Sequence, residues 1–230
     1  MLESLKKRVF EQNLALVKHG LVVLTWGNVS GRDSETGLIV IKPSGVPYQT
    51  MTAEDMVVVD INGNVVEGSL SPSSDLPTHL YLYQNYDSLG GVVHTHSTYA
   101  TAFAQSGKNI PVYGTTHADA FYGKVPCSRE LTDLEIDGDY ELNTGKVIVE
   151  TVKNADEIPA VLVKNHGVFT WGKTVEKAVE TAVTLEEVAK MAVFTQIINK
   201  DSGEVKQKLL DKHYLRKHGK NAYYGQGKKQ

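Results

Sequence analysis

The amino-acid sequence predicts a single α/β domain whose central sheet is mostly antiparallel and is flanked by helices. Short β-branched runs and amphipathic segments are interleaved along all 230 residues, and no Pro/Gly-rich linker or internal repeat separates them. The turn signal Asn62-Gly63-Asn64 joins two such runs, as in an antiparallel hairpin. The chain is 41% hydrophobic and 22% charged, which provides enough apolar material for one sizeable core.

The N-terminal part of the chain predicts a helix followed by short strands. Apolar residues recur at helical spacing over residues 2–20, and Gly20 marks the expected end of this helix. Thr52 is expected to cap a short helical turn over residues 53–55. Runs rich in β-branched residues predict strands at residues 21–25, 37–42, 56–61 and 65–66.

The remainder predicts alternating helices and strands. Pro77 favours the first turn of a helix over residues 77–86, and Thr174 can cap a long helix from residue 175 to about residue 199. Further helices are expected at residues 97–106 and 205–212. Strands are expected at the run that leads into His94, at residues 146–152 and at residues 160–163, with mixed strand and loop at residues 111–120.

Composition limits the possible partners and the cellular compartment. The net charge of −3 argues against bulk nucleic-acid binding and against a membrane surface. The single cysteine, Cys127, excludes an intramolecular disulfide and a cysteine-rich zinc module. Charged residues interrupt every apolar run near the N-terminus, and no stretch of about 18 apolar residues occurs, so neither a signal peptide nor a membrane span is expected. We expect a cytoplasmic protein.

The segment Gly90-Gly91-Val92-Val93-His94-Thr95-His96-Ser97 carries the strongest chemical signal. Residues two apart in a strand point to the same face, so His94 and His96 are expected to project together from a strand end. Two imidazoles placed in this way can bind one divalent metal. Such pairs also occur without metal, and two ligands make an incomplete zinc site.

A third histidine strengthens the metal hypothesis. The apolar run Ala160-Val161-Leu162-Val163 is followed by Lys164-Asn165-His166-Gly167, which reads as a buried strand with a sharp exit. Three histidines at strand ends are typical of a catalytic metal site that keeps an open position for substrate.

Four polar loops could bind phosphate through hydroxyls, amides and exposed backbone N–H groups. For any one of them an ordinary turn is the more common explanation, and only convergence in space would favour a binding site. None matches a P-loop or a dinucleotide-binding fingerprint. The four loops span residues 25–28, 42–45, 73–75 and 115–119.

Two acidic residues and the C-terminal tail have alternative interpretations. Asp75 could be a metal neighbour, a base or, more commonly, a helix cap. Asp119 could have a pKa raised by desolvation into the range of proton transfer, or it could be an ordinary solvated aspartate. Basic and aromatic residues alternate over residues 211–226, which fits RNA binding, an arm that brings Arg216 to a phosphate and Tyr224 to an active site, or a frayed tail.

Seven motifs, in order along nearly the whole chain, resemble those of the class II aldolase and epimerase family, and the tail resembles its epimerase branch. They are Thr25-Trp26-Gly27-Asn28-Val29-Ser30, Ile41-Lys42-Pro43-Ser44-Gly45, Pro72-Ser73-Ser74-Asp75, His94-Thr95-His96-Ser97, Gly114-Thr115-Thr116-His117-Ala118-Asp119, Asn165-His166-Gly167 and Lys212-His213-Tyr214-Leu215-Arg216-Lys217-His218-Gly219.

The resemblance implies a role for each matching residue. His94, His96 and His166 would bind Zn²⁺, or Mn²⁺ or Co²⁺, with Asp75 as the metal-side carboxylate. Asp119 and Tyr224 would be the proton-transfer pair. The expected contacts to the substrate and its phosphate are Gly27, Asn28, Lys42, Ser44, Gly45, Ser73, Ser74, Thr115, His213 and Arg216.

The resemblance also implies a reaction and an assembly. The reaction would interconvert L-ribulose 5-phosphate and D-xylulose 5-phosphate by retro-aldol cleavage and re-formation, in an L-arabinose or sugar-acid route. The assembly would be a four-fold homotetramer with active sites between subunits. The domain would span residues 1–226, with residues 227–230 disordered. The alternatives are an aldolase that releases its products and, less compatible with the acidic net charge, a non-enzymatic RNA-binding module.

Overall fold

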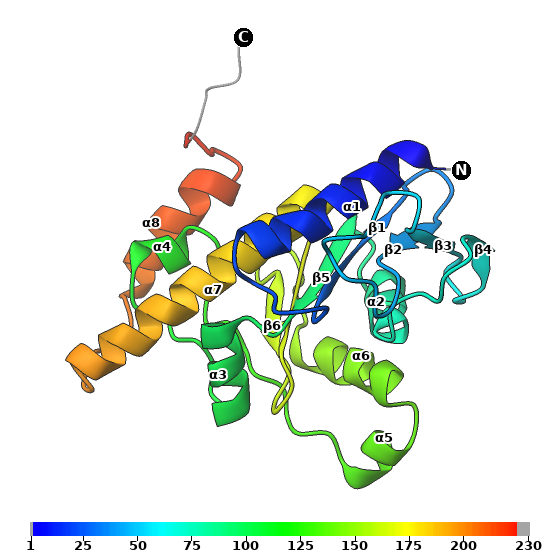
Figure 1. Cartoon of the computed structure of the whole chain (residues 1–230). Coiled ribbons are helices and arrows are strands. Elements are labelled where there is room, and N and C mark those ends of the chain that lie inside the picture. Colours follow the sequence, from blue (N-terminus) through cyan, green and yellow to red (C-terminus); the bar gives the residue numbers. More distant parts are fainter. Residues whose placement is uncertain (1, 225–230) are drawn as a thin grey trace.

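The computed structural model describes residues 2–224, and the expected disordered end at residues 227–230 lies outside the described residues. A seven-stranded sheet with the strand order β4-β3-β2-β1-β5-β7-β6 forms the centre of the molecule (Figure 1). Every pair of neighbouring strands in the sheet is antiparallel, which confirms the predicted fold class. The strands are β1 (Asn28–Arg32), β2 (Ile39–Ile41), β3 (Val57–Val59), β4 (Val65–Glu67), β5 (Gly91–Thr95), β6 (Ala160–Leu162) and β7 (Val168–Gly172).

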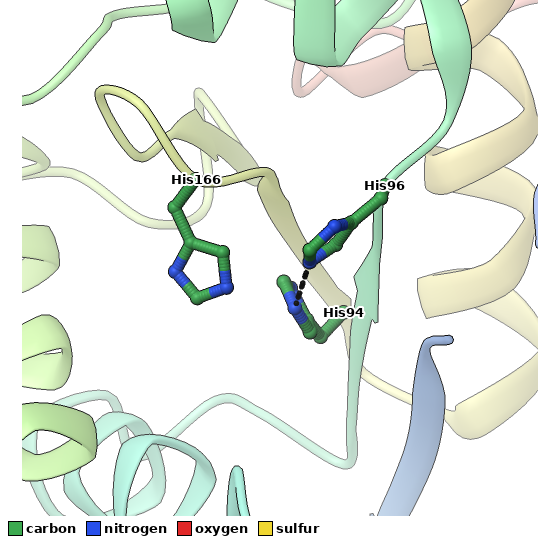
Figure 2. A group of neighbouring side chains, drawn as sticks. All are labelled: His94, His96 and His166. Carbon is green, nitrogen blue, oxygen red and sulfur yellow. Dashed lines mark hydrogen bonds between the residues drawn. The ribbon is translucent and has the colours of Figure 1, made fainter. Parts of the chain in front are cut away.

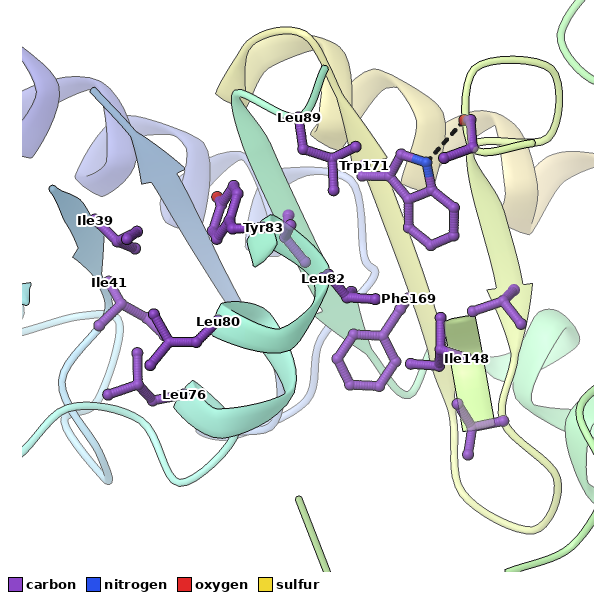
Figure 3. Packing of buried hydrophobic residues seen from close by; sticks show 14 of the residues in the cluster. Ile39, Ile41, Leu76, Leu80, Leu82, Tyr83, Leu89, Ile148, Phe169 and Trp171 are labelled. Carbon is purple, nitrogen blue, oxygen red and sulfur yellow. Dashed lines mark hydrogen bonds between the residues drawn. The ribbon is translucent and has the colours of Figure 1, made fainter. Parts of the chain in front are cut away.

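Helices cover both faces of the sheet. Helices α2 and α6 pack on one face, over a core that includes Ile39, Leu82, Phe169 and Trp171 (Figure 3). Helices α1, α3 and α7 pack on the other face. None of the helices formed by residues 2–224 is long and apolar enough to cross a membrane. The helices are α1 (Glu3–Lys18), α2 (Leu76–Asn85), α3 (Thr98–Ser106), α4 (Thr115–Ala118), α5 (Asp133–Asp137), α6 (Tyr140–Thr151), α7 (Val175–Ile198) and α8 (Gln207–His218).

Two of the predicted strands do not form. Residues 146–151 lie in α6, which ends before Val152, and its buried residues Thr144, Val147 and Ile148 recur at helical spacing and pack against α2. A run of β-branched residues therefore became a helix because tertiary packing outweighed local propensity. Residues 21–25 form a turn in which Leu24 has a positive φ of 54°, and the strand begins only at Asn28.

Three other segments differ from expectation. β7 was missed, although its alternating Phe169 and Trp171 face α2 and α6. Residues 115–118 form the short helix α4, where mixed strand and loop was predicted. Thr52 does not cap a helical turn as predicted; its backbone N–H and hydroxyl donate to the Asp55 carboxylate in a turn. The last helix runs over Gln207–His218 and not over residues 205–212, so much of the basic tail is a folded helix packed on α4.

A row of three glycines allows α7 to begin directly on the sheet. Gly31, Gly91 and Gly172 lie opposite one another on β1, β5 and β7. A Cβ atom on Gly91 would lie 2.6 Å from Val175 Cα, and one on Gly172 would lie 2.8 Å from the backbone nitrogen of Ala178. Because the obstructing atoms are backbone, a side chain here could be accepted only if the helix moved.

We therefore expect Gly91→Ala to destabilise the domain by about 1–3 kcal/mol or more, the cost of overpacking a tight interior. Urea unfolding followed by circular dichroism measures this change. Gly203→Ala is the matched control, because a Cβ atom there meets nothing within 4 Å. Equal stability of both variants would show that α7 can adjust at no cost.

Candidate metal centre

Three histidines from two strand ends meet at one point of the sheet. His94 lies on β5, His96 follows the same strand, and His166 lies in the turn between β6 and β7 (Figure 2). One ring nitrogen from each comes within 4.8 Å of the other two, and 3.0 Å separates the Nε2 atoms of His94 and His96. The predicted convergence of the three histidines is therefore confirmed. His94 is buried, His166 is half-buried and His96 is exposed, so the cluster is open on one side.

The turn that carries His166 is shaped by its neighbours in the sequence. Asn165 adopts a left-handed φ of 61°, which asparagine tolerates better than most residues. The backbone N–H of His166 donates to the Val163 carbonyl, and that of Val163 donates to the Gly167 carbonyl. These bonds form a tight turn that points the imidazole back toward β5 (Figure 2).

Hydrogen bonds at the Nδ1 atoms of His94 and His166 leave the other ring nitrogens available to a cation. His94 Nδ1 lies 3.0 Å from the Val168 carbonyl oxygen, to which it donates, and this fixes a free lone pair on Nε2. His166 Nδ1 lies 3.2 Å from the Tyr140 hydroxyl. Two nitrogens that share a tetrahedral zinc ion with bonds of about 2.0–2.1 Å lie about 3.3 Å apart, close to the separation found here. The three residues therefore fit a divalent metal of the zinc type.

Burial keeps two of these imidazoles neutral. Desolvation, followed by the nearby charge of His94, lowers the pKa of His96 below its usual range. Desolvation and the charges of His94 and His96 lower the pKa of His166 to about 3. Neutral imidazole is the form that binds metal, so no proton must be displaced from His166 at neutral pH.

Asp75 lies beside the cluster and not in the role of a helix cap. It occupies the N-cap position of α2, but its side chain makes no capping hydrogen bond. Its Oδ2 instead accepts a 2.7 Å hydrogen bond from Asn28 Nδ2. Burial by itself raises the pKa of Asp75, but the charges of His94 and His79 and the Asn28 bond outweigh burial and lower it. The carboxylate is thus ionised and available to a cation.

Three of the four polar loops meet near Asn28, which ends the loop at residues 25–28. The Asn28 amide nitrogen also donates to Ser73 Oγ at 3.0 Å, and the Ser73 backbone N–H donates to the Lys42 carbonyl. Ser44 donates its backbone N–H to the Ser71 carbonyl, which ties residues 42–45 to residues 71–75. Ser44, Gly45 and Ser74 are exposed, whereas the Oδ1 atom of Asn28 is buried without a partner. An unpaired acceptor between two hydroxyl-bearing loops suits a polar ligand.

Gly27 and Lys42 have mainly internal contacts. Gly27 has a φ of 98°, and its carbonyl accepts a 2.8 Å hydrogen bond from the Tyr48 hydroxyl. The Lys42 side chain is buried, and its Nζ donates to the carbonyls of Pro43 and Val46. The Lys42 ammonium therefore lies beneath the loop that contains Ser44 and Gly45.

A second cluster forms between α4 and α8. Asp119 accepts hydrogen bonds from His213 Nδ1 at 3.0 Å and from Arg216 Nη2 at 2.8 Å, and Lys217 Nζ lies 3.5 Å away. Thr115 is exposed at the start of α4. The Tyr224 ring is 59% exposed and lies beneath the guanidinium of Arg216, 4.8 Å from the ring centroid.

Of the two possibilities for Asp119, a pKa raised by desolvation and an ordinary solvated aspartate, the raised pKa is not found. Partial burial pushes this pKa up, but the hydrogen bonds from Arg216 and His213 and the charge of Lys217 outweigh burial and hold it below its usual range. The sequence pointed to the hydrophobic neighbours of Asp119 but gave no sign that α8 would fold against it. Asp119 is consequently an ionised acceptor at neutral pH.

The two clusters are separate within one chain. Helices α4 and α8 lie across α7 from α2 and α6 (Figure 1). Across residues 2–224, no hydrogen bond or ion pair connects the Asp119 cluster with the three histidines. Residues 42–45 and 71–75 therefore adjoin the histidines, while Thr115, Asp119, His213, Arg216 and Tyr224 form the other group.

Sequence reasoning missed two residues beside the histidines. Tyr140 lies within hydrogen-bond distance of His166, and His79 lies close enough to Asp75 and His94 for their charges to affect its pKa. The spacing of Asp75 and His79 was a usable signal, because residues four apart share one side of a helix. No comparable signal pointed to Tyr140.

Gly167 lies against two of the histidines, and its substitution should disturb them. A Cβ atom here would lie 2.9 Å from His96 Cδ2 and 3.2 Å from His94 Cε1. We expect Gly167→Ala to weaken zinc binding by about 10- to 100-fold, as is typical when the neighbours of metal ligands are displaced. Competition with a chromophoric chelator measures this affinity, with Gly203→Ala as the control. Unchanged affinity would show that the histidines are not held by this contact.

Comparison with known proteins adds independent information. The sequence profile of a family described as "Class II Aldolase and Adducin N-terminal domain" matches residues 7–193. An L-fuculose 1-phosphate aldolase structure is 28% identical, with a TM-score of 0.80 over 93% of this chain and 95% of that chain. YgbL from Escherichia coli is 22% identical, with a TM-score of 0.75 over 91% of this chain and 97% of its own. L-fuculose-1-phosphate aldolase from Thermus thermophilus is 21% identical, with a TM-score of 0.69 over 86% of this chain and 99% of its own.

Proposed function

Because the chain belongs to the class II aldolase and adducin N-terminal domain family, we propose that it is a divalent-metal-dependent enzyme that breaks and re-forms a carbon–carbon bond in a phosphorylated sugar. Its specific activity would be that of an L-ribulose-5-phosphate 4-epimerase, in a cytoplasmic pentose route. The observation that carries this proposal is the convergence of His94, His96 and His166 next to Asp75 and two hydroxyl-bearing loops.

His94, His96 and His166 would hold the cation, with Asp75 as the carboxylate on the metal side. When bound, a divalent cation supplies Lewis-acid stabilisation of the negative charge that develops on substrate oxygens. Zinc, manganese and cobalt all suit imidazole donors. The exposed side of the cluster, at His96, leaves room for substrate.

The loops at residues 42–45 and 71–75, which backbone hydrogen bonds join beside Asn28, would hold the phosphate. The exposed hydroxyls of Ser44 and Ser74 and the backbone at Gly45 are donors of the kind that bind phosphate oxygens. Lys42 would add its positive charge from beneath the loop. Gly27, Asn28 and Ser73 would complete the pocket. Phosphate contacts of this kind keep a cleaved fragment bound, which an epimerase needs and an aldolase does not.

Asp119 and Tyr224 would exchange the protons. Carbon 4 of the pentulose carries no acidic hydrogen, so inversion needs cleavage between carbons 3 and 4, rotation of the aldehyde and bond formation on its other face. Each face then needs its own acid/base group. Asp119 is ionised at neutral pH, which is the form that can take up a proton, and Arg216 places Tyr224 beside the same cluster.

These two groups would be supplied by a neighbouring copy in a homotetramer. Within one chain they lie apart from the histidines, and a two-part site of this kind is complete only when one copy meets another. Thr115, His213 and Arg216 would then reach the substrate from the same neighbour.

An aldolase that releases its two products is the second candidate. The L-fuculose 1-phosphate aldolase with a TM-score of 0.80 favours it. The tail motif Lys212-His213-Tyr214-Leu215-Arg216-Lys217-His218-Gly219 and Tyr224 favour the epimerase, because the tail resembles that branch of the family.

The deciding experiment uses purified full-length protein loaded with Zn²⁺, Mn²⁺ or Co²⁺. We expect it to convert L-ribulose 5-phosphate into D-xylulose 5-phosphate without net release of aldehyde, and to lose this activity when a chelator removes the metal. Aldehyde trapping during turnover detects released product. Net aldehyde release, or conversion of L-fuculose 1-phosphate in place of the pentulose, would establish the aldolase. No conversion of either substrate with any of the metals would contradict both candidates.

A further inference from the structure

His79 is a fully buried histidine with no place in the proposed chemistry. It lies on α2, four residues after Asp75, so both side chains are on the same side of the helix. Its ring packs edge-on against Phe169, and Phe169 stacks on the His94 ring with centroids 4.3 Å apart. His79 therefore adjoins both the carboxylate and the buried histidine of the candidate metal centre.

A chain of buried hydroxyls fixes one edge of the His79 ring. Ser30 Oγ on β1 lies 2.7 Å from His79 Nδ1 and 2.9 Å from the Tyr83 hydroxyl. All three residues are almost fully buried. Ser30 is two residues after Asn28 on the same strand, so both point to the face of the sheet that α2 covers.

Hydroxyl groups can both donate and accept, so this chain of hydrogen bonds can run from Tyr83 to His79. In that direction the Tyr83 hydroxyl donates to Ser30 Oγ, and the Ser30 hydroxyl donates to His79 Nδ1. Because desolvation lowers the pKa of His79 to about 3, the ring is neutral, and when Nδ1 accepts from Ser30 the ring hydrogen lies on Nε2.

The Nε2 atom of His79 is buried and has no hydrogen-bond partner in the described protein. A buried donor left unpaired costs about 1–3 kcal/mol, so an acceptor is expected nearby. After desolvation, the charge of Asp75 has the largest influence on His79, and it favours a positively polarised ring. The Asp75 carboxylate also has one oxygen, Oδ2, already bonded to Asn28.

We propose that His79 is a positioning residue of the metal centre: held by Ser30 through Nδ1, it donates its Nε2 hydrogen to the Asp75 carboxylate through one bridging water. Asn28 and His79 would then hold this carboxylate in place beside His94. The inference rests on the proposed role of Asp75 next to the cation. Hydrogen-bonded partners of this kind commonly orient metal-side ligands.

Two substitutions separate this role from simple core packing. In His79→Asn the side-chain amide can still reach Ser30 from near the Nδ1 position, but the donor at the Nε2 position is lost. In His79→Gln a donor is retained near the Nε2 position. Both variants remove a buried ring next to Phe169, so a purely structural role predicts similar defects in the two.

Zinc affinity, the visible spectrum of the Co²⁺-loaded protein and the melting temperature of the metal-free protein are measured for each variant. We expect His79→Asn to weaken zinc binding by about 10- to 100-fold and to change the Co²⁺ spectrum, and His79→Gln to stay within about threefold of wild type. The melting temperature should fall to a similar extent in both. Equal affinity in all three proteins, or losses that follow the melting temperature, would overturn the proposal.

Nitrogen-15 NMR of the histidine rings provides a test that needs no His79 variant to fold. We expect His79 of the metal-free wild type to carry its hydrogen on Nε2, and its Nε2 shift to change in Asp75→Asn. A hydrogen on Nδ1, or a shift that ignores Asp75, would contradict the proposal. These readouts do not depend on substrate, so a failed epimerase assay would overturn the proposed function and leave this inference standing.

Discussion

Replacing His94 with asparagine should abolish tight zinc binding and lower kcat/KM by about a thousandfold or more. His94 is the buried member of the cluster, and its Nε2 lies 3.0 Å from that of His96. Loss of this ligand leaves two imidazoles, too few for a stable zinc site. Lewis-acid stabilisation is worth several kcal/mol, and each 1.36 kcal/mol corresponds to about tenfold in rate.

The measurements are metal content after dialysis and steady-state kinetics with L-ribulose 5-phosphate. His19→Asn is the matched control, because His19 is exposed at the end of α1 and far in sequence from the histidine cluster. The control should keep full metal content and activity. If His94→Asn kept one bound metal per chain and normal kcat/KM, the three-histidine centre would not be the active site.

The metal cluster could be predicted from the sequence because the patterns that mark its histidines lie within a few residues along the chain. The spacing of His94 and His96 follows from the two-residue period of a strand, and His166 ends a second apolar run. Both strands formed as expected, and the antiparallel sheet brought their ends together. Alternation and turn residues act over a few neighbours, so they predict a strand end without knowledge of distant contacts wherever packing does not override them.

The features that the sequence did not reveal depend on distant contacts. Residues 146–152 have strand propensity, yet Gly145 lets α6 approach Tyr81 of α2, and a Cβ atom at that glycine would lie 2.8 Å from Tyr81 Cβ. The pKa of Asp119 is set by Arg216 and His213, which are brought to it by the packing of α8 on α4. Neither contact has a signature in the residues next to it along the chain.

The separation of the two clusters has a consequence for catalysis. One copy presents a cation site and phosphate loops, and the same copy presents Asp119 and Tyr224 on the far side of α7. If the acid/base groups act on a neighbour's substrate, the chemistry depends on assembly, and a single chain binds metal without being active. Metal binding and proton transfer should therefore be separable by mutation.

Replacing Tyr224 with phenylalanine should lower kcat by about 10²- to 10⁴-fold, the usual contribution of a general acid or base, and leave metal content unchanged. The ring remains to stack beneath Arg216, so only the hydroxyl is removed. Tyr223→Phe is the matched control, because Tyr223 is similarly exposed and its ring lies beneath Lys212. Equal activity of the two variants would exclude Tyr224 as a proton-transfer group.

Mixing the two inactive variants tests the shared site directly. The two variants, His94→Asn and Tyr224→Phe, are co-refolded or co-expressed as a mixture. An active site formed between two copies is intact when the Tyr224→Phe chain supplies its histidines and the His94→Asn chain supplies its tyrosine. Random assembly at equal amounts gives about a quarter of wild-type activity in a closed ring of such sites. A site contained within one chain gives none, because every chain then lacks one essential group. Recovery of activity in the mixture would establish that the active site is built from two copies, and its absence, with mixed oligomers demonstrated, would place Tyr224 and the metal in the same chain.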